Sequence, residues 1–267
     1  MRLDIYLVKN AFFSSRELAK FNITKGNVLV NGKVAIKPSF QVDASDEVTL
    51  SNQNAMPYVS RGGFKLEKAL QVFGVSCNGL QVVDVGASTG GFTDCALQHG
   101  AASVCAIDVG TNQLVRSLIE NPRVTSIEGV NIKDLHTNIL NPSQFHLLVT
   151  DLSFISLTKV MGYFKNLLLP QGSVIALIKP QFEVGASSVG KGGIVKDPQA
   201  HKMAIRSVIV SAAEHGLFAK QLSWAPIQSA SKNIEYLAHF VQQPCEEPNI
   251  DEVVKLAFAQ RKSVQTI

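Results

Sequence analysis

Cysteine and charge are both scarce in this sequence. Among 267 residues there are four cysteines, none of them in a C-x-x-C pair, and charged residues make up 17%. Scattered cysteines are arranged neither as zinc ligands nor as a disulfide framework, and they fit a reducing compartment. We therefore expect no metal site, buried thiols without chemistry, and a cytoplasmic protein.

The sequence also lacks any long apolar run. It has no stretch of about 18 uncharged apolar residues, the length that a membrane-spanning helix requires. The first ten residues include Asp4 and lack the apolar block of a secretory signal. With 46% hydrophobic residues the chain can build a core. We expect a folded protein without stable membrane association, and a monomer is the favoured oligomeric state.

The small net charge of +4 is concentrated near the N-terminus. Residues 1–70 hold ten Lys and Arg against six Asp and Glu, and the rest of the chain holds fifteen of each sign. A polyanion such as RNA would meet the first quarter of the chain first. Small domains also carry such an excess for solubility, so charge alone does not identify the partner.

A polar stretch divides the chain into two parts. Residues 51–57, Ser-Asn-Gln-Asn-Ala-Met-Pro, have the composition of a linker. Before it, the pattern predicts a small α+β domain with helices over 2–9 and 14–21, the second capped by Ser14 or Ser15, and strands over 28–30, 33–36 and 46–50. The turn Asn31-Gly32 joins the first two strands as a tight hairpin. The predicted boundaries are residues 1–50 for this domain, 51–60 for the linker and 61–267 for a second domain.

Strands and helices alternate in the second part. The predicted helices cover 63–73, 91–98, 111–120, 157–168 and 198–215, and the predicted strands cover 81–85, 103–107, 124–127, 145–150 and 173–178. Such alternation implies parallel pairing through right-handed crossovers. The sequence therefore predicts an α/β fold, a Rossmann-like, doubly wound and mostly parallel sheet.

A glycine-rich turn, Gly86-Ala87-Ser88-Thr89-Gly90-Gly91, separates the first strand of this domain from its helix. Such a turn lets a ligand approach the backbone at the N-terminus of a helix. Ser88 stands where the dinucleotide fingerprint requires its second glycine, which disfavours a pyrophosphate and hence a nicotinamide cofactor. Asp108 ends the next strand, where a carboxylate can bind two ribose hydroxyls; it could instead cap a helix. Asp84 is expected to orient the turn or the amino end of a cofactor.

Two charged residues follow buried strands directly, Asp151 after 145–150 and Lys179 after 174–178. The carboxyl ends of the strands form the ligand-binding edge of such a sheet. The pair could also be a structural salt bridge. Asp151 is followed by Leu152-Ser153-Phe154, whereas enzymes that methylate exocyclic amines have a Pro-Pro-aromatic run at this point. No cysteine follows a proline near the site, so the covalent route to carbon-5 of a pyrimidine lacks its nucleophile. What remains is methyl transfer to oxygen, with a lysine as base.

At this point the chain resembles the TlyA family of ribosomal RNA 2′-O-methyltransferases, related to FtsJ. The resemblance is carried by residues 59–66, 84–94, 151–157, 178–183 and 191–198, and residues 15–20 and 28–33 resemble an S4 RNA-binding domain. It implies S-adenosylmethionine as cofactor and ribosomal RNA or ribosomal subunits as partner, with a cytidine ribose as target. It also implies that the last strand of the sheet is antiparallel, which would bring Glu235 to the ligand edge.

The resemblance also assigns roles to residues. The implied catalytic tetrad is Lys65, Asp151, Lys179 and Glu235. Lys179 is the expected general base; burial or a nearby cation such as Lys65 would favour its neutral form, and the carboxylates would oppose this. The expected cofactor-binding residues are Asp84, Gly86, Ala87, Ser88, Thr89, Gly90, Gly91, Asp108, Val109 and Asp151. The expected RNA-binding residues are Arg2, Arg16, Lys20, Lys25, Lys33 and Arg61, each of which could equally be an ordinary solvated charge.

Three other functions stay open. A membrane-active haemolysin is one, because the family has carried that label. An oxidoreductase on the same fold and a non-catalytic RNA-binding protein are the others. The glycine-rich stretch 184–193 is either a loop that closes over RNA or a plain surface connection.

Overall fold

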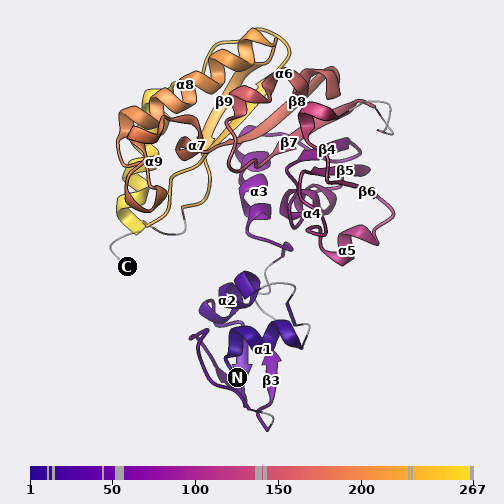
Figure 1. The fold of residues 1–267 in the computed structure, drawn as a ribbon, viewed down its shortest axis with the longest axis vertical. Helices are drawn as coiled ribbons and strands as arrows, with labels where there is room; N and C mark the ends of the chain where they lie inside the picture. The colour runs from indigo at the N-terminus through magenta and orange to yellow at the C-terminus, as the bar shows by residue number, and fades with distance from the viewer. Residues whose placement is uncertain are drawn as a thin grey trace. The chain divides into compact units, whose positions relative to one another are not determined.

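The computed structural model describes residues 1–10, 12–13, 16–43, 45–51, 57–135, 140, 143–227, 229 and 231–264. The chain forms two compact units, Met1–Arg61 and Gly62–Ile267 (Figure 1). Residues 52–56, half of the linker expected over 51–60, lie outside the described residues, as do both serines expected to cap the second helix.

The N-terminal unit packs two helices against a small antiparallel sheet. The helices are α1 (Leu3–Lys9) and α2 (Arg16–Thr24), and the strands are β1 (Val28–Val30), β2 (Lys33–Val34) and β3 (Val48–Leu50), in the order β2-β1-β3. Its core is made of aliphatic side chains from both layers, among them Leu3, Leu7, Ile23 and Val28.

The hairpin prediction is confirmed, although two strands are shorter than expected. Asn31 and Gly32 both have positive φ angles, 52° and 73°, as a tight turn of this kind requires. The strand expected over 46–50 begins only at Val48. Asp46 and Glu47 instead bind the hairpin turn. The side chain of Asn31 donates a hydrogen bond to Asp46 and accepts one from the backbone N–H of Glu47.

The second unit is built on a seven-stranded sheet with the order β6-β5-β4-β7-β8-β10-β9. Its strands are β4 (Gln81–Val85), β5 (Ser103–Asp108), β6 (Val124–Glu128), β7 (Phe145–Thr150), β8 (Leu168–Ile178), β9 (Phe218–Trp224) and β10 (Tyr236–Val241). The five strands from β6 to β8 are parallel, and β10 runs antiparallel to both of its neighbours. The mostly parallel α/β prediction is confirmed.

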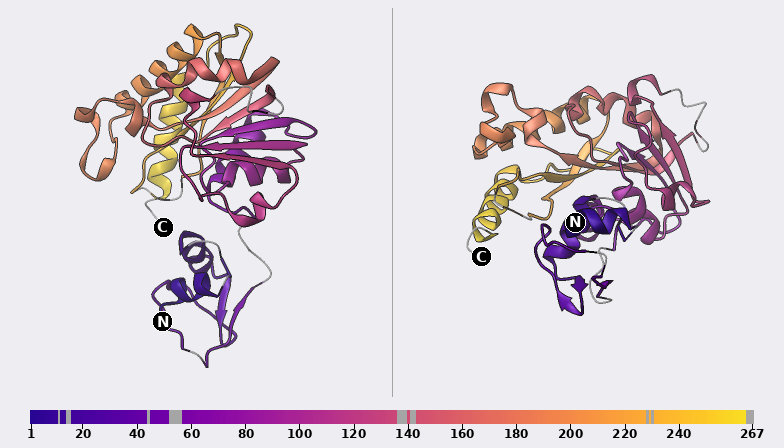
Figure 2. Two further views of the ribbon diagram at one scale, coloured as in Figure 1. Left: turned by 45° about the vertical axis from the view of Figure 1, so that its right-hand side comes forward. Right: turned by 60° about the horizontal axis from the view of Figure 1, so that its bottom comes forward.

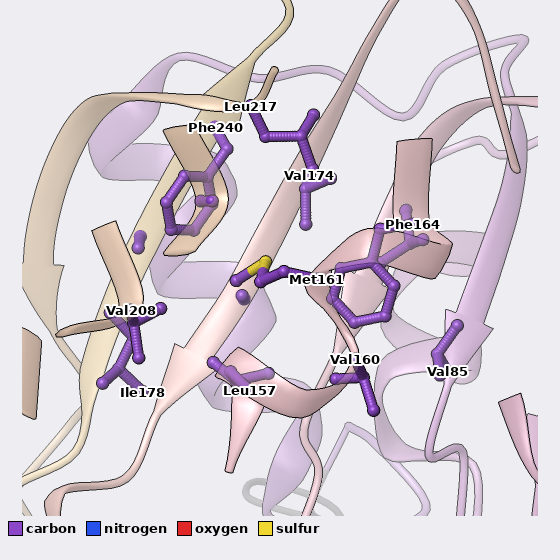
Figure 3. Packing of buried hydrophobic residues seen from close by; sticks show 14 of the residues in the cluster. Val85, Leu157, Val160, Met161, Phe164, Val174, Ile178, Val208, Leu217 and Phe240 are labelled. Atoms are coloured by element: carbon purple, nitrogen blue, oxygen red, sulfur yellow. The ribbon is translucent and has the colours of Figure 1, made fainter. Parts of the chain in front are cut away.

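Helices cover both faces of this sheet (Figures 1 and 2). On one face lie α3 (Gly62–Phe73) and α4 (Gly91–Gln98), where Phe73 stacks on His239 of β10 and Thr93 bonds to Asp84 of β4. On the other face α6 (Met161–Phe164), α8 (Pro198–Glu214) and α9 (Ile250–Val264) share one large core with the strands. Figure 3 shows part of that core, in which Met161, Phe164 and Phe240 pack together.

Two of the predicted helices are shorter in the structure than the sequence indicated. Instead of one helix over 157–168, the chain forms a 3₁₀ turn (Leu157–Lys159), α6, a second 3₁₀ turn (Lys165–Leu167) and the start of β8. Its apolar residues are buried at helical spacing, but Thr158, Val160, Gly162 and Asn166 are poor helix formers.

The other wrong helix was expected over 111–120 and shrinks to α5 (Arg116–Ile119). The Glu128 carboxylate accepts the backbone N–H groups of Asn112, Gln113 and Leu114 at 2.7–3.1 Å. Asn112 has a left-handed φ of 56°, which a right-handed helix does not contain, so the helix cannot begin at 111. The Glu128 carboxylate holds the backbone N–H groups of this loop.

Candidate active site

Strand register brings three charged residues to one edge of the sheet. Asp151 follows β7 and Lys179 follows β8, which are parallel neighbours. Glu235 precedes β10, whose first residue, Tyr236, pairs with Ile178 at the end of β8. Because β10 runs in the opposite direction, its beginning lies at the same edge as the ends of the parallel strands, and Glu235 comes opposite Lys179.

Lys65 reaches this edge from α3 and completes a chain of ion pairs. Its Nζ lies 3.0 Å from Asp151 Oδ2 and 2.8 Å from Glu235 Oε2. The other oxygen of Asp151, Oδ1, lies 2.6 Å from Lys179 Nζ. Lys179 also donates a hydrogen bond to Ser153 Oγ at 2.7 Å. The structure therefore brings together all four residues of the expected tetrad, with Asp151 bridging the two lysines.

The cluster is largely withdrawn from water. The side chain of Lys179 is 8% exposed, and those of Lys65 and Asp151 are 23% and 20% exposed. Burial lowers the pKa of Lys65, but the carboxylates of Asp151 and Glu235 outweigh it, so the net shift is upward. Burial raises the pKa of Asp151, but the ammonium groups of Lys65 and Lys179 outweigh it and hold that pKa below its ordinary value. The ammonium of Lys65 and the carboxylate of Asp151 thus favour each other's charged forms.

The glycine turn has the geometry that its sequence predicts. Gly86 and Gly90 have φ angles of 85° and 96°, which residues with a side chain rarely adopt. A Cβ atom on Gly86 would lie 2.8 Å from Leu152, and one on Gly90 would collide with Leu118. Ser88, in the position that departs from the dinucleotide fingerprint, also has a positive φ of 49°.

A cavity of about 430 Å³ opens between this turn and the charged edge. Its lining includes Gly86, Ser88, Asp108, Val109 and Asp151 of the expected cofactor-binding residues. It also includes residues that sequence reasoning did not name, chiefly Gln113, Val130, Asn131, Ile132, Leu152, Ser153 and Phe154. Asp151 belongs both to the cavity and to the ion-paired cluster, so the two form one continuous site.

Comparison with known proteins identifies the family. The FtsJ-like methyltransferase model matches residues 58–242, and the S4 domain model matches residues 1–48. The chain belongs to the FtsJ-like methyltransferase family. Within it, this chain is 41% identical to "Hemolysin A" of Brachyspira hyodysenteriae over 90% of its own length and 100% of that protein.

Two further relatives of this FtsJ-like methyltransferase are informative. The 16S/23S rRNA (cytidine-2′-O)-methyltransferase TlyA of Mycobacterium tuberculosis is 38% identical over 88% of this chain and 87% of that protein. The solved structure of a candidate hemolysin from Streptococcus thermophilus is 38% identical, covers 100% of this chain and 98% of its own, and superposes with a TM-score of 0.78. The names of these relatives thus refer to two different activities, RNA methylation and haemolysis. Among the residues described, no helix has the length and apolar character to span a bilayer.

Asp108 in this FtsJ-like methyltransferase binds backbone groups of two loops. Its Oδ2 accepts from the N–H of Ser88 and its Oδ1 from the N–H of Gly110, each at 2.7 Å. It therefore holds the glycine turn against the loop after β5 and does not cap α5. Each carboxylate oxygen has a second lone pair that a ligand at the cavity could use.

Asp84 lies beneath the glycine turn and does not line the cavity. It is fully buried, and its Oδ2 accepts a hydrogen bond from Thr93 Oγ1 at 2.7 Å. Its other oxygen has no protein partner among the described residues. Burial raises the pKa of Asp84 to about 7, against the opposing effect of the Thr93 hydrogen bonds. The remaining turn residues expected to bind cofactor, Ala87, Thr89, Gly90 and Gly91, also lie outside the cavity lining.

The arginines expected to bind RNA are paired with acids inside the S4 unit. Asp4, whose side chain is fully buried, accepts from Arg2 at 2.9 Å and from Arg16 at 2.8 Å. The hydrogen bond from Arg2, opposed by burial and reinforced by Arg16, lowers the pKa of Asp4 to about 2. Arg61 pairs with Glu17 at 2.6 Å. Sequence reasoning missed both acidic partners; the arginines stay half-exposed, so an anion can still reach them.

The expected lysines of the S4 unit are more accessible. Lys25 and Lys33 are exposed and Lys20 is half-buried. The ammonium of Lys25 lies 6.0 Å from the ring of Phe21. The grouping of these lysines with the arginines on one RNA-binding face stays a prediction.

Phe154 is the most unusual residue of the site that sequence reasoning left without a role. It is 92% exposed and has a φ angle of 66°, a left-handed conformation that is rare for a bulky side chain. Its ring lies 5.3 Å from that of Phe182, and it borders the cavity next to Ser153. The sequence signal was an aromatic residue four positions beyond a strand end, where polar residues are expected.

Proposed function

We propose that this protein transfers a methyl group from S-adenosylmethionine to the 2′-oxygen of a cytidine ribose in ribosomal RNA. The observation that carries the proposal is the ion-paired cluster of Lys65, Asp151, Lys179 and Glu235, which adjoins the cavity at the glycine turn. The name of the Mycobacterium tuberculosis relative supports the substrate, and the match to the S4 domain supports RNA as the partner.

The chemistry of the cavity fits this cofactor. Asp108 offers carboxylate oxygens suited to ribose hydroxyls, and Val109, Ile132 and Leu152 offer apolar surface suited to an adenine ring. Gly86 allows close approach to the backbone, and Ser88 leaves less room for a pyrophosphate. The cofactor, when bound, supplies a methyl group on a sulfonium whose sulfur keeps the electron pair of the broken carbon–sulfur bond.

The ion-paired cluster suits removal of a proton from a sugar hydroxyl. In the proposed reaction Lys179 Nζ accepts the proton of the 2′-hydroxyl as the oxygen forms its bond to the methyl carbon. Asp151 and Ser153 orient Lys179, because both lie within hydrogen-bonding distance of its Nζ. Lys65 holds Asp151 and Glu235 in place through its two ion pairs. Alignment of the oxygen with the methyl group supplies the rest of the acceleration.

The test compares Lys179→Ala with the wild-type protein in methylation of purified ribosomal subunits. We expect the wild-type protein to add 2′-O-methyl groups to cytidine. The variant should bind cofactor and ribosomal subunits with unchanged dissociation constants, and its single-turnover rate should fall by at least about a hundredfold, as expected for loss of a general base. Normal single-turnover methylation by the variant would exclude Lys179 as the base.

Mapping 2′-O-methyl sites on ribosomes from cells with and without this protein identifies the nucleotide and the subunit. If no site depends on the protein, the proposed function is wrong. Leakage from liposomes at low protein concentration would then favour a membrane-active protein. Tight nicotinamide binding without S-adenosylmethionine binding would favour an oxidoreductase.

A further inference from the structure

Two segments lie side by side where β7 and β8 end. The first is the arc from Asp151 to Leu157, and the second is the short segment from Lys179 through α7 (Pro180–Glu183). They are joined near the strand ends by the bond from Lys179 to Ser153 and further out by the ring contact between Phe182 and Phe154. A third tie, from Glu183, fastens the far end of the arc.

The Glu183 carboxylate uses both of its oxygens for this tie. Its Oε2 accepts from Ser156 Oγ at 2.6 Å, and its Oε1 accepts from the backbone N–H of Leu157 at 2.9 Å. Leu157 is buried and opens a 3₁₀ turn, so the tie ends on a part of the core. Among the described residues, no cation forms an ion pair with Glu183.

The position of Glu183 indicates that its role lies outside its own helix. It is the last residue of α7, a single turn, and both of its described hydrogen bonds go to the neighbouring arc. Burial disfavours its charged form and raises its pKa, although the bonds from Ser156 and Leu157 oppose that effect. The hydrogen bonds that this carboxylate accepts from Ser156 and Leu157 of the neighbouring arc explain why it lies in a half-buried position.

The part of the arc between the two polar ties carries the exposed Phe154. Ser153 is fixed to Lys179 at one end, and Ser156 is fixed to Glu183 at the other. Phe154, between them, keeps a left-handed backbone conformation that persists only where the surroundings impose it. The two ties are those surroundings, and they hold Phe154 and Ser153 at a set distance from the lysine amine.

We infer that Glu183 is a positioning residue, which fixes the arc from Ser153 to Ser156 relative to Lys179 and thereby sets where the target nucleotide lies. The inference rests on the proposed function, because the arc borders the site in which the RNA hydroxyl would meet Lys179. Glu183 itself contacts none of the four residues of the ion-paired cluster in any described interaction, so it acts through the arc.

The experiment measures single-turnover methylation of purified ribosomal subunits at saturating cofactor by wild type, Glu183→Ala, Glu183→Gln and Ser156→Ala. We expect the rate constant of Glu183→Ala to fall about tenfold or more, since small misplacements of reacting groups cost that much. Glu183→Gln keeps an acceptor for Leu157 and a donor for Ser156 Oγ, so it should stay within about threefold of wild type. The amplitude should stay complete in every variant, whereas a folding defect would lower the amplitude.

The double variant tests whether Glu183 acts through Ser156. Ser156→Ala should slow the reaction in the wild-type background and have no further effect in the Glu183→Ala background. Glu214→Ala, which removes an exposed glutamate of α8, is the matched control and should methylate at the wild-type rate.

The outcomes separate the two proposals. Absence of methylation by the wild-type protein overturns the proposed function. Wild-type methylation with an equal rate constant in Glu183→Ala overturns the positioning role, and so do additive effects of the two substitutions. If Glu183→Ala does not fold, a rate constant of Ser156→Ala equal to that of wild type overturns it.

Discussion

Phe154 combines an exposed ring with a backbone conformation that costs free energy. A left-handed conformation in a bulky residue costs on the order of 1–3 kcal/mol and is found mainly at functional sites. Its ring borders the cavity beside Ser153, which bonds to Lys179. An aromatic ring in that position is suited to stacking on the base of the target nucleotide, which is worth about 1–3 kcal/mol.

Replacement of Phe154 by glycine should therefore raise stability and lower activity. Glycine adopts the left-handed conformation without strain, so the free energy of unfolding should rise by about 1 kcal/mol. Loss of base stacking should reduce kcat/KM for ribosomal subunits by about ten- to a hundredfold. Chemical denaturation and steady-state methylation measure the two effects. Tyr163→Ala removes an exposed aromatic residue that does not line the cavity, and a similar loss of activity in it would contradict the assignment.

At the scale of elements, Asp84 ties β4 to α4 and makes the apo protein sensitive to pH. Its pKa is raised to about 7 in the folded state, against an ordinary value near 3.8. Between about pH 4 and pH 7 the folded state therefore binds a proton that the unfolded state lacks. By linkage, the contribution of Asp84 to stability declines as pH rises through this window and is constant above it.

Asp84→Asn should remove this dependence. The free energy of unfolding of the variant relative to wild type should increase from pH 5 to pH 7, with an upper limit of about 4 kcal/mol for the whole window. Chemical denaturation without cofactor at pH 5, 6, 7 and 8 measures it. Asp134→Asn, which makes the same substitution at an exposed aspartate, is the matched control. A pH-independent effect of Asp84→Asn would show that the folded-state pKa is ordinary.

Elements whose signals are local could be predicted from the sequence, and those shaped by distant groups could not. The sequence pattern predicted β4 and α4 with the bounds that the structure shows, because the glycine turn marks where β4 ends and where α4 begins. The helix expected at 111–120 was wrong because Asn112 takes a left-handed conformation in a loop that Glu128, 14–16 residues further along the chain, holds by its backbone N–H groups. No local pattern contains that information.

The same holds for the site. Asp151 and Lys179 could be placed at one sheet edge from the strand pattern alone. Glu235 and Lys65 could not, because one reaches the edge through the reversed direction of β10 and the other from a helix on the face of the sheet. Only the resemblance to a family pointed to them.

At the scale of the whole molecule, the two units are expected to divide the work. The second unit has its own core, so a chain without residues 1–55 should remain folded and bind cofactor with an unchanged dissociation constant. Its affinity for ribosomal subunits should fall about tenfold or more, with a weaker dependence on salt, because fewer cations are left to contact phosphates. Binding measured at several salt concentrations tests this. Equal affinity of the truncated and complete chains would exclude an RNA-binding role for the first unit.

The place of β10 between β8 and β9 also has a consequence for synthesis of the protein. β9 emerges from the ribosome before β10, yet among the described strands its one partner is β10, so it cannot join the sheet until that strand is inserted. Glu235 arrives with the same insertion. A nascent chain that stops before β10 therefore lacks an edge of the sheet and one group of the ion-paired cluster, so we expect it to have no methylation activity.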